Sequence, residues 1–496
     1  MSKLLQINSA DNVAVALKPL KKGESFDIGG NALTVLCDVP FGHKVALKNL
    51  KKGEEIIKYG HTIGIAQCDI ACGDWVSDRN IKTALGELLS YTYNPLKSCS
   101  IKDATEHATF NGYLRKNGKA GVRNELWIVP TVSCVNAVAQ KMAAEFSKTE
   151  YAKYTDGVFA IPHTYGCSQL GCDHENTRKI LRGLTLHPNA GGVLVLGLGC
   201  ENNRLSKFRE FLGDYDSDRI CFMQAQDFSD EIAEGVEILK GLALKMKGDS
   251  RTKLPLSKLS VGLKCGGSDG FSGITANPLI GAFSDMAITR GASCVLTEVP
   301  EMFGAETLLM QRACNKEVFE KIVEMINSFK EYFMSYKMPV YENPSPGNRD
   351  GGISTLEEKS LGCVQKGGHA LVRDVLMYGD FVKSAGLSLL TSPGNDPVAT
   401  TTLAAAGCQI ILFSTGRGTP WGAAVPTIKI ATNTPLSENK RNWIDFNAGE
   451  IANGKPICEL AKEFFDFVVE VANGKKTKSE QNGYKEIAIF KNGVTL

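Results

Sequence analysis

Hydrophobic and polar positions are patterned differently in successive parts of this 496-residue chain. Up to residue 95, short alternating segments such as 34–39 and 55–59 are separated by glycine turns. Short alternating runs bounded by glycine are typical of strands in a small, mostly β structure. We therefore predict a compact, mostly β module over residues 1–95.

This first module contains an internal repeat. The sequence LKPLKKGE at 17–24 recurs as LKNLKKGE at 47–54, and a weaker third turn, CGDWV, follows at 72–76. Each full copy ends in a Lys-Lys-Gly-Glu turn. Lysine-rich turns also serve as solubilising surface, so the repeat predicts structure without predicting a binding site.

The pattern changes after residues 96–108, which follow a proline at position 95, are polar, show no periodicity and are predicted to be a linker. Between 109 and 250, apolar runs at 125–132, 157–162 and 192–197 each precede a glycine-rich or polar loop. A helical pattern follows each loop, at 137–146, 175–184 and 204–212. Strand, loop and helix in this order predict a parallel α/β domain.

The same alternation resumes over residues 256–496, after a charged break at 245–255. Strands are predicted at 259–263, 293–297, 387–390, 409–413 and 427–431, and helices at 278–289, 316–334, 397–406 and 459–473. The stretch 343–368 is glycine-rich and has little periodicity, so we expect a long functional loop, with disorder as the alternative. The predicted fold class is α/β, with a small β module followed by two parallel-sheet, Rossmann-like domains.

Composition and charge exclude several classes of protein. Lys and Arg number 56 against 54 Asp and Glu, so the net charge is only +2 and lacks the excess of positive charge that is typical of nucleic-acid-binding proteins. No apolar run approaches the ~18 residues that span a bilayer, and the first residues lack a signal-peptide layout. The 15 cysteines are scattered and odd in number, which favours reduced thiols in the cytoplasm over a disulfide scaffold. We expect a homo-oligomer only because homo-oligomers are common among soluble proteins, since no feature of the sequence indicates one.

Three cysteines stand at equivalent positions of the second domain. Cys134, Cys167 and Cys200 are 33 residues apart, and each lies in the loop after a predicted strand. Loops that follow parallel strands meet at one edge of a sheet, where helix N-termini favour thiolates. Three thiolates suit iron or zinc and leave a position open for substrate. The alternative is that each is a small buried hydrophobic residue.

Histidine is scarce, so its positions matter. Of the seven histidines, His163 lies four residues before Cys167, and His43 follows a glycine in a turn of the first module. Either is a candidate metal ligand or acid/base group. Either could instead be a structural histidine that is held by hydrogen bonds.

The last domain contains features suited to anions. The loops CGGSDG at 265–270 and GRGTP at 416–420 follow predicted strands, and glycine-rich backbone offers free N–H groups. Arg417 can grip a carboxylate with two parallel bonds. Neither loop has nucleotide-binding spacing. Glu298, in TEVPE at 297–301, is a candidate base or metal ligand at another strand end.

Longer motifs follow one another along the whole chain. They are GY at 112–113, GVRN at 121–124, PTVSCVN at 130–136, HTYGCSQLG at 163–171, GLGCENN at 197–203, CGGSDGFSGITANP at 265–278, TEVPEMFGAE at 297–306 and FSTGRGTPWG at 413–422. In this order they resemble the altronate/galactarate family of sugar-acid dehydratases. The first module, with GHK at 42–44, resembles the SAF module that opens these enzymes.

The resemblance implies a hydro-lyase of uronate catabolism, with a sugar acid as its small-molecule partner. Its reaction would convert D-altronate to 2-dehydro-3-deoxy-D-gluconate with Fe²⁺ or another divalent metal such as Mn²⁺. A base removes the C2 proton, a cation stabilises the resulting dianion, and the C3 hydroxyl leaves. We assign the metal to the three cysteines, acid and base to His43 and His163 with Glu298, and substrate binding to Arg123, Asn124, Ser268, Asp269 and Arg417. This assignment requires the SAF module to cover the edge of the sheet.

Several alternatives remain open at this point. The thiolates could hold one Fe²⁺ or three corners of an iron–sulfur cluster, or the metal could lie on oxygen and histidine ligands. Galactarate dehydratase and a sulfolactate-type lyase resemble the chain in the same motifs. A sugar-acid-binding regulatory protein is the non-enzyme alternative. A redox role for Cys167 and Cys172 is disfavoured by their C-x4-C spacing.

Overall fold

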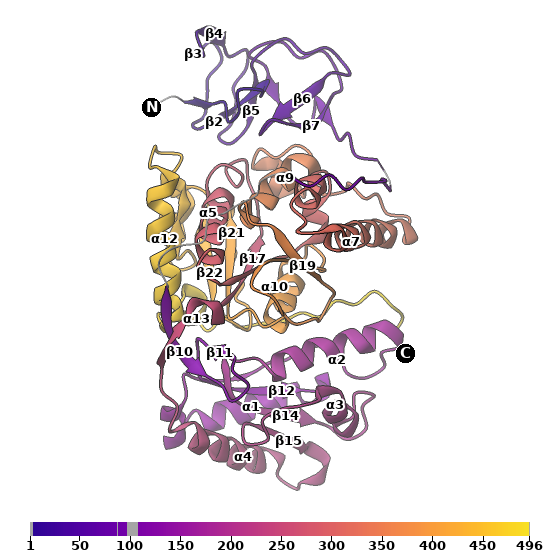
Figure 1. The fold of residues 1–496 in the computed structure, drawn as a ribbon, viewed down its shortest axis with the longest axis vertical. Helices are drawn as coiled ribbons and strands as arrows, with labels where there is room; N and C mark the ends of the chain where they lie inside the picture. The colour runs from indigo at the N-terminus through magenta and orange to yellow at the C-terminus, as the bar shows by residue number, and fades with distance from the viewer. Residues whose placement is uncertain (1–2, 87, 97–107, 496) are drawn as a thin grey trace.

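The computed structural model describes residues 3–86, 88–96 and 108–495. It has three parts in a row: a β module, a domain built on a seven-stranded sheet, and a domain built on a four-stranded sheet (Figure 1). The α/β fold class with a small β-rich module and two parallel sheets is therefore confirmed. Almost all of the predicted linker falls at 97–107, outside the described residues.

The N-terminal module consists of short antiparallel strands. One sheet has the order β1-β2-β5-β8, a second β6-β7-β9, and β3 pairs with β4. The strands are β1 (Leu4–Leu5), β2 (Val13–Ala16), β3 (Ser25–Ile28), β4 (Asn31–Thr34), β5 (Lys44–Ala46), β6 (Glu55–Lys58), β7 (His61–Ala66), β8 (Trp75–Val76) and β9 (Ile81–Lys82).

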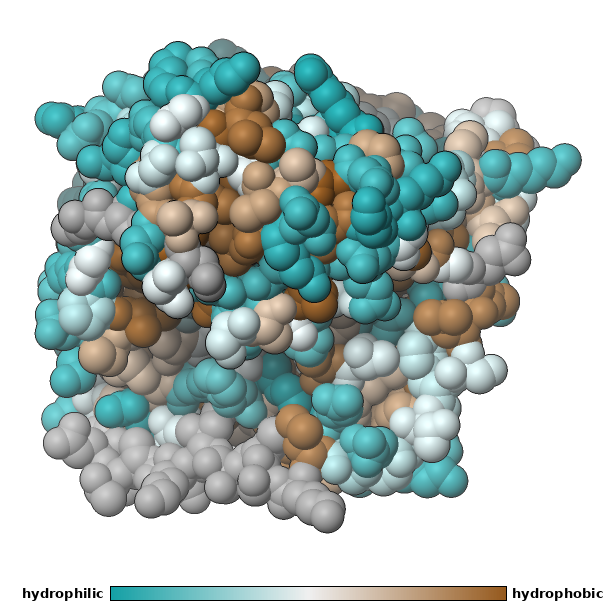
Figure 2. All heavy atoms as spheres, turned by 90° about the horizontal axis from the view of Figure 1, so that it is seen from above, coloured by the Kyte–Doolittle hydropathy of each residue, from teal (hydrophilic) through white to brown (hydrophobic). Residues whose placement is uncertain are grey.

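The internal repeat is visible in the structure as two equivalent turns. Leu20 bridges Val39 in the first copy, and Leu50 bridges Ile70 in the second. Lys21 and Lys51 each pair with an aspartate, at 2.7 and 2.8 Å, with both lysines exposed. Such surface pairs stabilise a fold by at most about 1 kcal/mol. Hydrophilic side chains accordingly project along the outer rim of the molecule seen from the module's side (Figure 2).

The second domain has a parallel four-stranded sheet of order β13-β12-β14-β15. These strands are β12 (Glu125–Pro130), β13 (Val158–Ala160), β14 (Ala190–Gly197) and β15 (Ile220–Gln224). One face packs against α1 (Asn136–Phe146) and α4 (Glu231–Met246), the other against α2 (Gly171–Thr185) and α3 (Leu205–Leu212). A small antiparallel sheet at the entry and exit of the domain joins β10 (Thr109–Leu114), β11 (Ala120–Gly121) and β16 (Thr252–Pro255).

The C-terminal domain has a parallel sheet of order β19-β20-β18-β17-β21-β22-β23. Its strands are β17 (Ser260–Cys265), β18 (Ser293–Leu296), β19 (Val372–Leu376), β20 (Gly386–Leu390), β21 (Ile410–Thr415), β22 (Thr427–Ala431) and β23 (Phe446–Asn447). The strands β18, β20, β21 and β22 are buried along their whole length, which is why they read as continuous apolar runs. The order reverses around β17, because the chain first adds β18 on one side and later β21 on the other.

Helices cover both faces of this larger sheet. α5 (Ala276–Ile288) packs against α12 (Ile457–Ala472) on one face, and α10 (Asp396–Ala405) lies on the other, against α2 of the second domain. The remaining helices are α6 (Glu306–Met310), α7 (Lys316–Ser335), α8 (Pro346–Asp350), α9 (Leu356–Cys363), α11 (Thr434–Asn439) and α13 (Lys478–Gln481). Among the described residues, no helix is both long and apolar enough to cross a bilayer.

The stretch 343–368 differs from the expected loop. It forms α8, α9 and a 3-10 turn, and most of it is buried. Its helices have five and eight residues, too few to show a hydrophobic period. They are set by their caps, since Thr355 accepts a hydrogen bond from Glu358 N–H and Ser345 forms a capping box with Asn348. The prediction of a long loop without secondary structure was wrong. The residues in the sequence that could have indicated the two helices are their caps, Ser345 and Thr355.

Candidate active site

Charged and nucleophilic side chains gather at the carboxyl edge of the seven-stranded sheet. The loops after β17, β18 and β20 meet there, next to the strand at which the sheet order reverses. In open α/β sheets this is the usual position of a ligand crevice. We define the catalytic cluster as the side chains gathered at this edge from the end of β17, the loop after β18, the segment before α8, α9 with the turn that follows it, and the start of α10. They are Lys264, Cys265, Glu298, Glu301, Asn343, Lys359, Cys363, Lys366 and Asp396.

Lys264 forms the base of the catalytic cluster. Its ammonium group donates to Glu298 Oε1 at 2.7 Å, to Asp396 Oδ1 at 2.6 Å and to the Cys265 carbonyl at 2.6 Å. These three bonds use all three of its N–H groups. The side chains of Lys264 and Glu298 are 0% and 1% exposed. Lys264 therefore fixes Glu298 in place.

Glu298 occupies an unusual backbone conformation, with a φ of +73°. A non-glycine residue in this left-handed region is strained, and such strain concentrates at functional sites. The other carboxylate oxygen of Glu298 accepts the Cys265 N–H at 3.0 Å. Burial, opposed by the Lys264 ammonium, raises the pKa of Glu298 to about 8. A carboxyl with such a pKa can take up and release a proton near neutral pH.

Two thiols touch each other beside Glu298. Cys265 Sγ lies 3.3 Å from Cys363 Sγ, and both residues are buried. A hydrogen bond from the Cys363 thiol, with the nearby Lys366 ammonium, holds the pKa of Cys265 well below its usual value. The pKa of Cys363 is raised by the same contact and by burial. The two pKa values are therefore shifted in opposite directions, so Cys265 loses its proton more readily than Cys363.

The third part of the cluster is a carboxylate, an amide and an ammonium group. Glu301 Oε1 accepts from Lys359 Nζ and from Asn343 Nδ2, both at 3.0 Å. Lys359 also donates to Asn343 Oδ1 at 2.9 Å. The second oxygen of Glu301 is buried and has no partner among the described residues. Among the described residues, these two bonds leave one N–H group of Lys359 for a ligand.

The SAF-like module covers this edge of the sheet (Figure 1). Phe41 stacks on Phe271 with ring centroids 4.2 Å apart. The Gly42 carbonyl lies against Gly270 and Gly352, where any side chain would collide with it. The Nε2 atom of His43 lies 3.2 Å from the Asp350 carbonyl. The prediction required the module to cover the sheet edge that carries the three cysteines; in the structure it covers the edge of the C-terminal sheet instead.

Helix α9 connects the module to the catalytic cluster. Glu357 accepts from the Ala84 N–H at 2.6 Å, and Glu358 accepts from Lys44 and Lys58, each at 2.8 Å. The next residue, Lys359, and the last, Cys363, belong to the cluster. The Lys44 and Lys58 ammonium groups lower the pKa of Glu358 to about 2 against the effect of burial.

A small closed cavity lies where the module meets the cluster. Its volume is about 10 Å³, room for roughly one water molecule. The module contributes Lys58 and Tyr59 to its wall, and the C-terminal domain contributes Ser268, Lys359 and Cys363. The Ser268 hydroxyl is buried and, in the described part of the chain, has no partner. Admitting a sugar acid would require the module to lift.

The other predicted substrate-binding residues of the glycine-rich loops lie in different environments. Asp269 is buried and accepts four hydrogen bonds, from Phe271 N–H, Ser272, Thr432 and Asn433, so it ties its own loop to the loop after β22. Arg417 is exposed on the loop after β21. Of the predicted substrate-binding residues, Ser268 and Asp269 both line the cavity.

Arg123 and Asn124 are not part of this edge, because they precede β12 at the opposite end of a strand. All five N–H groups of Arg123 are used: two donate to Glu480, at 2.7 and 3.0 Å, and three to backbone carbonyls. Asn124 accepts from Arg115 at 2.8 Å. Both side chains fasten the second domain to neighbouring segments, which leaves the Arg123 guanidinium no donor for a substrate in this conformation.

The three cysteines lie where the sequence predicts, in loops after β12, β13 and β14. Cys134, Cys167 and Cys200 are all exposed. In the described chain, no three His, Cys, Asp or Glu side chains are grouped so that they could hold a metal ion. The donor type suits iron, but the thiols as placed do not make a metal site.

His163 and His43 belong to different domains and are not brought together within one chain. His163 accepts the Tyr165 N–H at Nδ1, and its Nε2 lies 2.8 Å from the Pro130 carbonyl. His43 accepts the Trp75 indole N–H at Nδ1. The second ring nitrogen of each must therefore carry the proton and donate to a carbonyl. Burial lowers the pKa of both.

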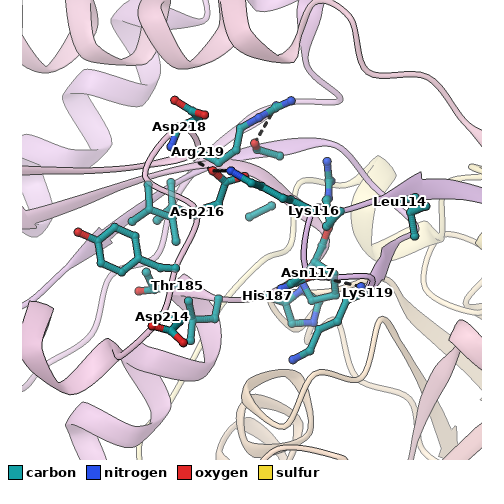
Figure 3. Close-up of a pocket in the computed structure, with 18 of the residues that line it drawn as sticks. Leu114, Lys116, Asn117, Lys119, Thr185, His187, Asp214, Asp216, Asp218 and Arg219 are labelled. Carbon is teal, nitrogen blue, oxygen red and sulfur yellow. Dashed lines mark hydrogen bonds and ion pairs between the residues drawn. The ribbon is translucent and has the colours of Figure 1, made fainter.

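Another cavity lies far from the catalytic cluster. It has a volume of about 640 Å³ and opens where β14 and β15 begin, between the second domain and Phe381 (Figure 3). Acidic and basic side chains line it together, and Arg219 is paired with Asp249 at 2.7 Å. Because it lies at the starting ends of the strands, it lacks the convergence of loops that marks the other edge.

Sequence reasoning did not single out Lys264, Lys359, Lys366 or the Cys265–Cys363 contact. A lysine at the end of an apolar strand, as in VGLKC at 261–265, is the one local signal for them. The partners of these residues lie far away in sequence, which hides the cluster.

Comparisons with known proteins add independent findings. Family models match three segments: the altronate/galactarate dehydratase SAF domain at 2–84, the second domain of D-galactarate dehydratase/altronate hydrolase at 112–247, and the C-terminal domain of D-galactarate/altronate dehydratase at 256–495.

Similar proteins extend over the full length. The altronate dehydratase of Bacillus subtilis (strain 168) is 54% identical over 499 residues, which cover 100% of both chains. That of Escherichia coli (strain K12) is 53% identical and covers 99% of both. The galactarate dehydratase (L-threo-forming) of Escherichia coli (strain K12) is 35% identical, over 98% of this chain and 96% of its own.

Proposed function

The chain belongs to the altronate/galactarate dehydratase family and is a sugar-acid hydro-lyase, and we propose that its substrate is D-altronate. The product would be 2-dehydro-3-deoxy-D-gluconate. The identity of 53–54% to two altronate dehydratases, against 35% to a galactarate dehydratase, supports this choice.

We propose that the reaction takes place in the catalytic cluster, with Glu298 as the base. The supporting observation is the buried Glu298 carboxylate, held by Lys264 at 2.7 Å and strained at its backbone. The raised pKa suits the removal of a weakly acidic C2 proton and its later delivery to the departing C3 hydroxyl. The module must lift before a sugar acid can reach this group.

Removal of the C2 proton puts a second negative charge on the substrate carboxylate. Lys359 has an N–H group left and lines the cavity, so it is suited to bind that carboxylate. Lys366 adds a second buried ammonium group nearby, next to the Cys265 side chain. Fixed cations in a water-excluded site stabilise such charge far better than water does.

The direct test is turnover of a panel that contains D-altronate, D-galactarate and (2R)-sulfolactate, with detection of 2-keto acid. We expect kcat/KM for D-altronate to exceed that for galactarate by about 10–200-fold, the range that pocket contacts supply. A preference for galactarate or sulfolactate would contradict the proposed substrate. Binding of a sugar acid without turnover by any member would favour the regulatory protein.

We also propose that the protein binds iron through Cys134, Cys167 and Cys200. The support is their exposure in three consecutive strand-end loops and their soft sulfur donors. When bound, iron would supply Lewis acidity. Because the thiols as placed are not gathered into a site, no step above depends on it.

Metal analysis tests this proposal separately from activity. We expect anaerobically prepared protein to contain iron, and the Cys134→Ser variant to lose most of it, since a thiolate ligand is removed. Cys172→Ser is the matched control, because Cys172 begins α2 and is equally exposed. Equal iron in Cys134→Ser and in the unmodified protein would rule out the thiolate site, and acid-labile sulfide would separate a cluster from a single ion.

A further inference from the structure

The two copies of the repeat in the SAF module form an internal comparison. Residues 11–30 align with 41–60 at a constant offset, and the strands and turns of the two copies match. Differences between the copies at matched positions therefore show what the second copy does beyond folding. Several such differences introduce a polar or aromatic side chain, among them Val13 to His43, Ala14 to Lys44, Ile28 to Lys58 and Gly29 to Tyr59.

The turn of the second copy is unfavourable for its sequence. In the first copy, Gly29 and Gly30 have φ values of +62° and +84°, and nothing lies within 4 Å of where their side chains would be. In the second copy, Tyr59 and Gly60 take φ values of +62° and +75°. Two residues at positive φ form the hairpin turn that favours glycine and asparagine. Tyr59 is therefore strained where its counterpart is relaxed, and folding alone does not account for it.

The strained turn points into the candidate active site. The first-copy turn is in open space, whereas Lys58 and Tyr59 both line the cavity beside Ser268, Lys359 and Cys363. The Tyr59 hydroxyl lies directly against the backbone of Gly273, where a side chain would collide with it. Glycine at that position leaves room for the phenol.

Lys58 holds the tyrosine in place. Its ammonium group donates to Glu358 Oε1 at 2.8 Å and lies 4.8 Å from the centre of the Tyr59 ring. Among the described residues, the Tyr59 hydroxyl donates to no acceptor, so its hydrogen remains available for a ligand.

We propose that the Tyr59 hydroxyl donates a hydrogen bond to a hydroxyl group of the bound sugar acid. This makes Tyr59 a substrate-binding residue that the SAF module contributes, with Lys58 as its positioning residue. The carboxylate of the substrate would go to Lys359, because a cation outcompetes a neutral phenol for it. The inference rests on the proposed function and adds to it a contact that selects polyhydroxy acids.

The test is Tyr59→Phe, which removes one hydroxyl and keeps the ring. We expect KM for the preferred sugar acid to rise about 3–10-fold with kcat changed less than about twofold, since one neutral hydrogen bond to substrate is lost. In a Glu298→Gln background, the Kd for the sugar acid should rise by the same factor. Tyr151→Phe, in the second domain, makes the same chemical change away from the site and should alter neither constant.

The outcomes separate this inference from the proposed function. Unchanged KM and Kd in Tyr59→Phe, with an active unmodified enzyme, would overturn the inference alone. A fall in kcat and in melting temperature at constant KM would also overturn it, because that is a structural role. Tyr59→Gly recreates the relaxed turn of the first copy, so it should weaken substrate binding without lowering the melting temperature. If the unmodified enzyme has no activity on any sugar acid, that result counts against the proposed function instead.

Discussion

Glu298→Gln is expected to lower kcat for sugar-acid dehydration by about 10²–10⁴-fold, the usual contribution of a positioned general base. Glutamine keeps the size and the contact with Lys264 but cannot accept the C2 proton. The unmodified enzyme should gain activity as pH rises toward 8, because the pKa of Glu298 is raised to about 8 and the base must be ionised. The residual rate of the variant should lack this dependence. Steady-state kinetics between pH 6 and 9 measures both.

A second buried glutamate provides the matched control. Glu306 is also buried in the C-terminal domain, and its carboxylate accepts from Lys330 at 3.2 Å and from Tyr91 at 2.5 Å. Glu306→Gln should lower stability while leaving kcat within a few-fold of the unmodified value. A Glu298→Gln variant that retains most of its activity, with the ordinary pH profile, would remove Glu298 from the mechanism.

Lys264→Met is expected to lower the free energy of unfolding by about 3–5 kcal/mol, the cost of leaving a buried charge without its partner. Two carboxylates, Glu298 and Asp396, lose their shared cation. The loss should be smaller at pH 6 than at pH 9, because protonation of Glu298 removes the unpaired charge. Urea denaturation at the two pH values measures it.

Lys330→Met is the comparison for this variant. Lys330 is as deeply buried as Lys264 but pairs with one carboxylate, Glu306, so its loss should cost less. A Lys264→Met variant that loses under about 1 kcal/mol, or loses the same at both pH values, would show that Lys264 does not hold Glu298 by charge.

The alternation of strands and helices was predictable because parallel strands covered on both faces are continuous apolar runs. The helix α4 was not among the predicted elements, and neither were α8 and α9. The helices α8 and α9 are too short to show a hydrophobic period and are defined by their caps. Whether an element is a helix or a strand could thus be predicted where burial imposes a hydrophobic pattern over many residues.

The site was harder to predict because its contacts are distant in sequence. Cys265 and Cys363 are 98 residues apart, and Arg123 is satisfied by Glu480, 357 residues away. The GVRN motif at 121–124 indicates that Arg123 has a role, but it does not show which residues the guanidinium contacts. Sequence likewise indicates that loops gather at strand ends in both α/β domains, but the docking of His43 and Lys44 decides which edge the module covers.

The position of the bound substrate tests the central claim most directly. We would determine a crystal structure of Glu298→Gln with D-altronate, since loss of the base should trap the intact acid. The account predicts the sugar acid between Tyr59, Ser268 and Lys359, with its C2 atom facing residue 298. Sugar acid bound instead at the edge of the four-stranded sheet, beside Cys134, Cys167 and Cys200, would contradict it.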